Sequence, residues 1–206
     1  MQQPLSKMTF KALVKKTVVK YWEEKFRLDA SQLSSLKYFF PANMSLTSPH
    51  PVWLSASNSS YEVSKATVQA QMLSGRYRTE LLRSHWSDNP NGWCLTPECV
   101  GSQTTEDLEH ILTSCPSLSH HRGNLQIFTT KFAKNNPLVQ TILSTYCNPD
   151  HPLFCQFLLD CSCLPEVQSI VITNGSLCLD MLLYVGRTWC YTLHRERARL
   201  LNKWIF

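Results

Sequence analysis

The sequence predicts a mainly α-helical fold, a helical assembly with a small Cys3His zinc module at its centre. Apolar residues recur near the 3.6-residue spacing of a helix in several long stretches. A hydrophobic content of 43% with 17% charged residues is sufficient for a core. We expect an N-terminal helical segment with a Ser/Pro-rich loop (1–60), an arginine-containing helix with the zinc module (61–120), and a C-terminal helical segment (121–206).

The N-terminal part is expected to form an amphipathic helix over Lys7–Leu28 and a loop over Ser45–Ser60, which is rich in Ser, Pro and Asn. The apolar stripe of the helix consists of Leu13, Val14, Val18, Trp22 and Phe26. Its lysines either form a solvated face or contact a polyanion, and the sequence leaves both open. If the stripe is exposed, the helix once packed against another domain.

A second helix is expected over Tyr61–His85, followed by a turn at Ser87–Gly92. One face of this helix is apolar, with Val63, Ala66, Ala70, Leu73, Tyr77 and Leu81. Three arginines lie toward its end, Arg76, Arg78 and Arg83. We assign Tyr77 to the core because it belongs to the apolar face.

Further helices are predicted over Pro116–Phe132, Pro137–Tyr146 and Pro152–Cys161, and the pattern of Pro165–Thr173 fits a helix or a strand equally. The last segment, Leu177–Trp204, is expected to be the longest helix. Its apolar stripe consists of Leu182, Val185, Trp189, Leu193, Leu200 and Trp204. Arg195 and Arg199 lie four residues apart on another face of it.

Four residues form a metal-ligand pattern, C-x4-C-x10-H-x4-C, made by Cys94, Cys99, His110 and Cys115. Three thiolates and one imidazole are the ligand set of a closed tetrahedral structural zinc site. Pro97 fits a tight turn between the first two ligands. A helix from Glu106 onward would carry the histidine, with the last cysteine at or past its end. We therefore expect one structural zinc ion with no open position for a reactive water.

The other six cysteines, Cys147, Cys155, Cys161, Cys163, Cys178 and Cys190, are interpreted as reduced thiols. The N-terminal segment has no apolar stretch of signal-peptide length, so we expect an intracellular protein of the nucleus or cytoplasm, or both. Two metal-binding alternatives are less favoured. One is a second site formed by Cys155, Cys161 and Cys163 with His151, and the other is extra ligation by His120 and His121.

The charge distribution is uneven along the chain. Residues 1–37 carry a balance of +5 and residues 181–206 a balance of +4, whereas residues 91–180 carry −5. The two ends are therefore the better candidates for contacts with a polyanion. The most apolar window, Val167–Val185, contains polar residues and a glycine, so we expect no transmembrane helix and no membrane partner.

No motif for catalysis is found. The sequence has no glycine-rich phosphate loop, no G-x-S-x-G and no HExxH. The trio Glu106, Asp107 and Glu109 is expected to begin the helix that carries His110, where negative charge complements the helix dipole. The residues alone therefore predict a protein that is not an enzyme.

The segment AQMLSGRYRTELLRSHWSDNPNGWCLTPECVGSQTTEDLEHILTSCPSL resembles the region after the polymerase core in reverse transcriptases of non-LTR (LINE-type) retrotransposons. The resemblance is carried by the G-R-Y-R sequence at residues 75–78, by Trp93, by the four metal ligands and by Pro116. The closing RTWCYTLHRERARLLNKWIF is also similar to the end of such proteins. The similarity extends from about Lys11 to the end of the chain.

The resemblance does not extend to catalysis, because a reverse transcriptase needs paired aspartates for two magnesium ions and the sequence contains no Asp-Asp pair. The chain is expected to be a C-terminal piece of such a protein without its polymerase and endonuclease domains. The family uses this region to hold template RNA or target DNA, which implies RNA or single-stranded DNA as the partner. The residues expected to contact it are Arg76, Arg78, Arg83, Trp86, Trp93, Arg195 and Arg199.

Two alternatives stay open at this point. Trp86 and Trp93 offer surfaces on which unpaired bases stack, or they pack around the zinc ion. The whole chain is either the nucleic-acid-binding module or a zinc-stapled helical scaffold. Such a scaffold would have packed against the missing polymerase domain, and it would bind no nucleic acid by itself.

Overall fold

The structure is a computed structural model that describes residues 6–40, 45, 48–54, 56, 59–86, 88–174 and 176–202. These residues are mainly α-helical, and their only β-type pairing is in two isolated bridges, which confirms the predicted fold class. The α-helices are α1 (Lys7–Gln32), α2 (Pro51–Leu54), α3 (Ser60–Leu73), α4 (Glu80–Arg83), α5 (Ser119–Phe132), α6 (Pro137–Tyr146), α7 (Phe154–Asp160), α8 (Pro165–Asn174) and α9 (Ser176–Leu200). Four short 3-10 turns are η1 (Ser34–Leu36), η4 (Pro116–Leu118), η5 (Ala133–Asn135) and η6 (Cys161–Cys163), and one π-helical turn is η3 (His110–Ser114).

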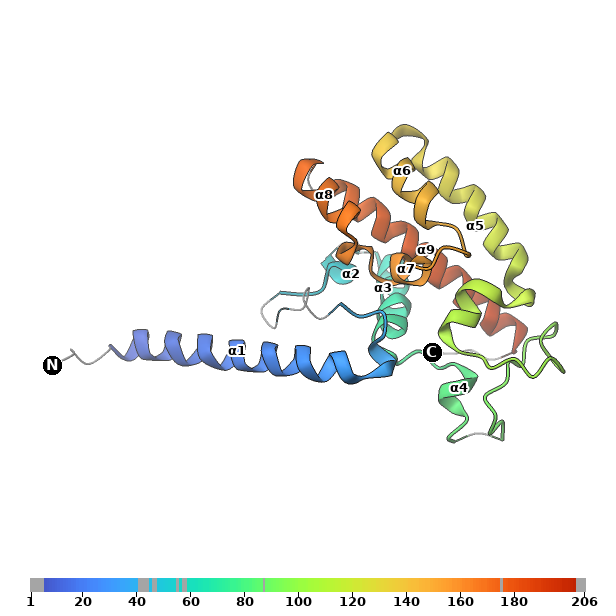
Figure 1. Cartoon of the computed structure of the whole chain (residues 1–206), viewed down its shortest axis with the longest axis horizontal. Coiled ribbons are helices and arrows are strands. Elements are labelled where there is room, and N and C mark those ends of the chain that lie inside the picture. Colours follow the sequence, from blue (N-terminus) through green and yellow to red (C-terminus); the bar gives the residue numbers. More distant parts are fainter. Residues whose placement is uncertain are drawn as a thin grey trace.

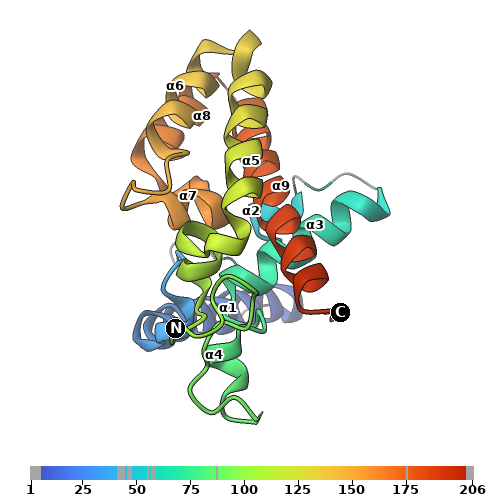
Figure 2. The ribbon, with the colours of Figure 1, turned by 90° about the vertical axis from the view of Figure 1, so that its right-hand side faces the viewer.

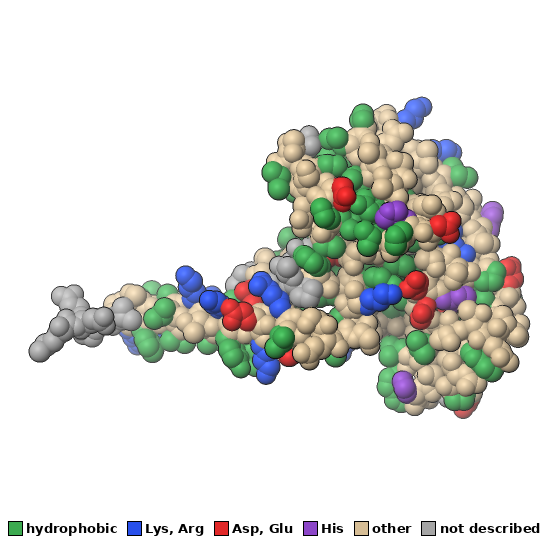
Figure 3. Space-filling model, viewed as in Figure 1, with side chains coloured by type: hydrophobic (Ala, Val, Ile, Leu, Met, Phe, Trp, Pro, Cys, Tyr) green, Lys and Arg blue, Asp and Glu red, His purple; other side chains and the backbone are tan. Residues whose placement is uncertain are grey.

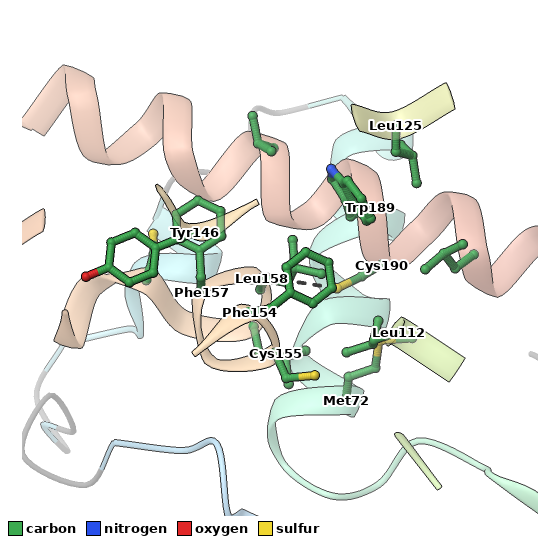
Figure 4. Close-up of a cluster of buried hydrophobic side chains, with 14 of the residues drawn as sticks. Met72, Leu112, Leu125, Tyr146, Phe154, Cys155, Phe157, Leu158, Trp189 and Cys190 are labelled. Atoms are coloured by element: carbon green, nitrogen blue, oxygen red, sulfur yellow. Dashed lines mark hydrogen bonds between the residues drawn. The ribbon is translucent and has the colours of Figure 1, made fainter. Parts of the chain in front are cut away.

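Helix α9 is the centre of the core, and α3, α5, α6, α7 and α8 all pack against it (Figures 1 and 2). Trp189 of α9 is fully buried, with its ring 5.4 Å from that of Phe154 (Figure 4). The indole Nε1 of Trp189 donates a hydrogen bond of 3.1 Å to Thr129 Oγ1, so its polar atom is satisfied. A Cβ at Gly186 would lie 2.3 Å from the Leu158 carbonyl oxygen, so only glycine allows α7 to approach α9 this closely.

The C-terminal helices largely follow the predicted ranges. Helix α6 has the predicted bounds, because Pro137 occupies its first turn and the Asn136 side chain caps it by accepting a hydrogen bond from the Val139 amide. The ambiguous segment at 165–173 is a helix, α8. The predicted stripe of α9 is buried at Leu182, Val185, Trp189 and Leu193, whereas Trp204 lies outside the described residues.

The predicted single helix Tyr61–His85 is wrong, since α3 ends at Leu73 and α4 begins at Glu80. Gly75 has a φ of +67°, and a Cβ there would lie 2.4 Å from the Ser35 carbonyl oxygen. The close approach of the η1 turn therefore requires a glycine in a left-handed conformation, which ends the helix. Helix α4 begins at a new cap, where Thr79 Oγ1 accepts a hydrogen bond from the Leu82 amide.

The break divides the predicted apolar face of that segment. Leu73 and Tyr77 are buried as expected, but Val63 and Leu81 are exposed. The predicted loop Ser45–Ser60 lies partly outside the described residues, and its described part contains the short helix α2.

Helix α1 projects from the rest of the molecule as a single arm (Figure 1). It has 26 residues, one more than α9, so the prediction that the C-terminal helix is the longest is wrong for the described residues. Ala30 is its one buried residue. Leu13, Val14, Val18 and Trp22 of the predicted stripe are 43–51% exposed, and Figure 3 shows apolar and basic side chains together on this arm. Phe26 is half-buried, with its ring 6.0 Å from that of Phe39.

One described stretch, Phe154–Thr173, is long and apolar enough to span a membrane by length and composition. In the structure it is divided between α7, η6 and α8, and 44% of its apolar window is buried inside the protein. Core helices of soluble proteins often have this composition, so the stretch is weak support for a membrane segment.

Candidate metal centre

Cys94, Cys99, His110 and Cys115 form a compact buried group. One potential ligand atom from each residue lies within 4.8 Å of every other, so the group could hold a metal ion. Among the described residues this is the one group of at least three such side chains. The four ligands predicted from the sequence therefore converge in the fold.

Two of the distances between these atoms match a tetrahedral ion. The Sγ atoms of Cys99 and Cys115 are 3.8 Å apart, and Cys99 Sγ is 3.5 Å from His110 Nε2. Zinc bonds of about 2.3 Å to sulfur and about 2.0–2.1 Å to nitrogen, at a tetrahedral angle, give about 3.8 Å between two sulfurs and about 3.5 Å from sulfur to nitrogen. Both distances therefore match a tetrahedral site.

The last two ligands share one side of the chain because the helix between them is a π-turn. The Cys115 amide donates to the His110 carbonyl at 2.7 Å, an i to i+5 hydrogen bond. In an α-helix, residues five apart point in different directions, but the wider π-turn brings the two side chains together. The structure also confirms that Cys115 ends the helix, directly before Pro116.

The start of this helix differs from the prediction. Helical residues begin at Leu108, and Asp107 Oδ1 accepts a hydrogen bond of 2.7 Å from the His110 amide. Glu106 was expected to begin the helix but precedes it, and its side chain is completely buried. Its role is therefore in the interior rather than in complementing the helix dipole.

The first two ligands lie on a short loop. The Cys99 amide donates to the Thr96 carbonyl at 2.9 Å, which closes the tight turn predicted at Pro97. The Cys94 amide donates to the Thr104 carbonyl at 2.8 Å, next to the isolated bridge between Trp93 and Thr105. These backbone hydrogen bonds place both thiols without help from a regular strand.

Hydroxyl groups form the next layer around the ligands. Thr96 Oγ1 lies 3.2 Å from Cys94 Sγ and 3.4 Å from Cys115 Sγ. Ser114 Oγ lies 3.2 Å from His110 Nδ1, so the histidine can bind metal through Nε2 while its other nitrogen is hydrogen-bonded. Such outer contacts orient ligands and fix the histidine tautomer. The sequence pattern did not reveal them, because they depend on how the chain folds.

The metal centre is joined to α9 by buried charges. Glu106 Oε1 accepts hydrogen bonds from Arg197 and from the Glu80 amide, and Glu106 Oε2 lies 3.5 Å from Cys94 Sγ. Arg197 is fully buried and also pairs with Glu80 at 3.7 Å. Burial raises the pKa of Glu106, and the neighbouring Arg197 opposes that rise. No motif or spacing in the sequence singles out Arg197.

The thiols of the group influence one another. A hydrogen bond with Cys115 lowers the pKa of the Cys94 thiol, and the same pair raises the pKa of Cys115. Burial raises the pKa of Cys99. A metal must displace the protons from the protonated thiols of this group, so binding would release protons.

The arginines predicted to contact nucleic acid differ in their exposure and in whether they pair with an acid. Arg76, Arg78 and Arg195 are exposed. Arg83 is half-buried and donates to Glu80 Oε1 at 2.9 Å, while Arg199 is exposed and hydrogen-bonded to Glu196. Two of the predicted arginines are therefore engaged with acids of the same chain.

The two tryptophans are both at the surface. Trp86 is 78% exposed and Trp93 is 37% exposed. The alternative in which Trp86 packs around the metal is therefore wrong. The Trp86 ring contacts the ring of His85 in a T-shaped arrangement, with 5.8 Å between the centroids.

The other metal-binding alternatives do not occur among the residues that the structure describes. Cys155, Cys161, Cys163 and His151 form no second group among the described residues. All six remaining cysteines are free, and most are buried. His120 is exposed and His121 pairs with Glu196 at 3.4 Å, and neither belongs to the metal group.

No protein-family model, no curated protein and no solved structure matches the chain. The resemblance to the retrotransposon region therefore stays a prediction.

Proposed function

We propose that the chain is a zinc-stabilised, non-catalytic module that binds RNA or single-stranded DNA, of the kind found at the C-terminal end of non-LTR retrotransposon reverse transcriptases. The observation that carries the proposal is the buried Cys3His group, whose four potential ligand atoms lie within 4.8 Å of one another. It lies in the part of the chain that carries exposed arginines and an exposed tryptophan.

Zinc is the ion that this ligand set favours. Three thiolates and an imidazole select a soft or borderline metal over magnesium or calcium, and a tetrahedral site of this size with three sulfur ligands and one nitrogen ligand is typical of structural zinc. Four protein ligands fill the coordination sphere. A closed site of this kind supports a role in shape rather than in catalysis.

The proposed nucleic-acid surface is on the metal lobe, which we define as residues 74–118. Figures 1 and 2 both place α4 and the following loop at the end of the molecule opposite α6. Arg76 and Arg78 can pair with phosphates through their planar guanidinium groups. The exposed ring of Trp86 can stack on an unpaired base, which favours a single strand over a duplex. Arg195 and Arg199 would extend this surface along α9.

The test is the affinity of the zinc-loaded chain for a short labelled single-stranded RNA, measured across a salt series. We expect affinity to fall steeply with salt, because phosphate contacts release counterions. The double variant Arg76→Ala/Arg78→Ala should weaken binding and reduce the salt slope by roughly 0.7 for each lost contact.

The matched control is Lys131→Ala/Lys134→Ala, which removes two exposed positive charges from the α5–α6 end. This control should bind nearly as well as the unchanged chain. Absence of binding at low salt, or an equal loss in both double variants, would contradict the nucleic-acid proposal.

A second candidate function is favoured by helix α1. Most helix stability in proteins comes from the packing of an apolar face, yet α1 has 26 residues and only one buried side chain, Ala30. This exposure supports a scaffold that docks on another domain, such as the polymerase domain of a parent protein. Val18→Asp with Trp22→Asp should then abolish that docking and leave RNA affinity unchanged. An equal loss of RNA affinity would instead place α1 in the nucleic-acid surface.

A further inference from the structure

Arg122 of α5 lies against the metal centre, and only part of its buried guanidinium group is hydrogen-bonded. It is buried, and its Nη2 donates a hydrogen bond of 2.6 Å to the carbonyl oxygen of the ligand Cys115. Its Nη1 is also buried and has no hydrogen-bond partner among the described residues. One half of the guanidinium group is therefore satisfied by the ligand backbone, and the other half is not.

The electrostatic neighbours of Arg122 are two of the metal ligands. Burial lowers the pKa of this arginine, and the sulfurs of Cys115 and Cys99 act in the opposite direction. Among the described residues, Arg122 forms no ion pair with a carboxylate, unlike Arg187 and Arg197. A buried arginine normally has an acid as its partner, because an isolated buried charge is very unfavourable.

The loaded centre would provide the missing negative charge. Two positive charges of a zinc ion against three thiolates leave one net negative charge on a Cys3His site. Arg197 does not neutralise it directly, because it is paired with the carboxylates of Glu106 and Glu80. Arg122 is buried, is hydrogen-bonded to the backbone of the ligand Cys115, and has no such carboxylate pair among the described residues.

We propose that Arg122 is the counter-charge of the metal-thiolate centre. It is a positioning residue whose positive charge stabilises the thiolates of Cys99 and Cys115 and so strengthens metal binding. The inference rests on zinc occupancy of the proposed site, and it is independent of nucleic-acid binding. A rival role is purely structural: the guanidinium would tie α5 to the Cys115 carbonyl and its charge would be irrelevant.

Two substitutions separate charge from hydrogen bonding. Arg122→Lys keeps the positive charge but loses the planar fork, whereas Arg122→Met keeps a long side chain and loses the charge. The matched control is Arg187→Met, which removes another buried arginine that pairs with Glu62. Circular dichroism establishes that each variant is folded before metal binding is measured.

The measurements are zinc affinity by chelator competition and the absorption spectrum of the cobalt-substituted chain. Arg122→Met should lose roughly 10–100-fold in zinc affinity, the usual effect of removing a group that supports metal ligands. Its thiolate-to-cobalt charge-transfer band should move to longer wavelength, because the sulfur lone pairs lose a stabilising positive charge. Arg122→Lys and Arg187→Met should both stay close to the unchanged chain.

Each contrary result has a distinct meaning. If Arg122→Met keeps the affinity and the band position of the unchanged chain, the counter-charge role is wrong. If Arg122→Lys loses as much affinity as Arg122→Met with no band shift in either, the role is the structural one. If the unchanged chain binds neither zinc nor cobalt, the proposed metal site itself fails, which is a separate outcome.

Discussion

Helices α1 and α9 have almost the same length, 26 and 25 residues, and both carry aromatic and basic side chains, but their environments are opposite. Helix α9 is surrounded by other helices, and Trp189 on it is fully buried. Helix α1 buries Ala30 alone, and Trp22 on it is about half exposed. The comparison shows that apolar spacing predicts a helix, whereas burial depends on what the rest of the chain places beside it.

The two helices also differ in the ion pairs that connect them to the rest of the protein. Near its C-terminal end, α9 is tied to the metal lobe through Arg197, Glu106 and Glu80, close to the metal ligand Cys94. Helix α1 has no comparable buried ion pair among the described residues; its Lys20–Glu24 pair is exposed to solvent. Loss of the metal should therefore reach the end of α9 and leave α1 unaffected.

The largest effect is expected from Cys115→Ser or from a strong chelator. Removal of a structural zinc should cost several kcal/mol and unfold residues 86–120, which include most of the metal lobe, because metal binding and folding of this segment are coupled. Hydrogen exchange should rise in the lobe and in the last turns of α9, and stay unchanged in α1. An equal rise in hydrogen exchange along the whole chain, α1 included, would contradict this prediction.

Arg197→Met should destabilise the protein by about 3–5 kcal/mol, because it leaves buried carboxylates without their cation. The matched control is Arg195→Met on the same helix, where the arginine is exposed and the change should be within about 0.5 kcal/mol. Denaturant unfolding measures both. Equal midpoints for the two variants would show that the buried network contributes nothing.

Trp189→Ala and Trp22→Ala make the same substitution on the two helices. The first should cost about 3–5 kcal/mol, since it leaves a cavity at the centre of the core and removes the hydrogen bond that the indole donates to Thr129. The second should change the free energy of unfolding by less than about 0.5 kcal/mol in the isolated chain. A large loss from Trp22→Ala would mean that α1 packs against something in solution, for example a second copy.

A smaller effect should depend on pH. Burial, helped by Arg197, lowers the pKa of His194 from 6.5 to about 4, and its Nδ1 lies 3.1 Å from Tyr77 Oη. Between these values the unfolded chain binds a proton that the folded chain does not, so stability falls as pH drops from 6.5 toward 4. The loss is at most about 3 kcal/mol. His194→Gln should flatten this slope at equal zinc concentration, and an unchanged slope would assign it to other groups.

The helical class, the bounds of α6 and the clustering of the four Cys3His residues could be predicted from the sequence, because each depends on local spacing or on a local cap. Prediction failed where distant segments meet. Gly75 ends α3 because the chain at Ser35 comes too close for a side chain. Glu106 has the sequence position of an acid at a helix start but is buried against Arg197, which lies 91 residues away.

The arginines of α9 also show that local spacing does not predict contacts between distant segments. The spacing of Arg195 and Arg199 correctly placed both on an exposed face. Arg197 lies between them in sequence but on the opposite side of the helix, and only the fold shows that it turns toward the metal lobe. Residues around the ligands, such as Thr96 and Arg122, could not be identified before the loop and α5 were placed together.

The most direct test of the metal centre is native mass spectrometry of the purified chain, combined with thermal unfolding with and without chelator. We expect one zinc ion per chain, its absence from Cys94→Ser and Cys115→Ser, and a clear fall in melting temperature when chelator removes it. A folded chain that carries no metal, with a melting temperature unchanged by chelator, would contradict the zinc-stabilised fold.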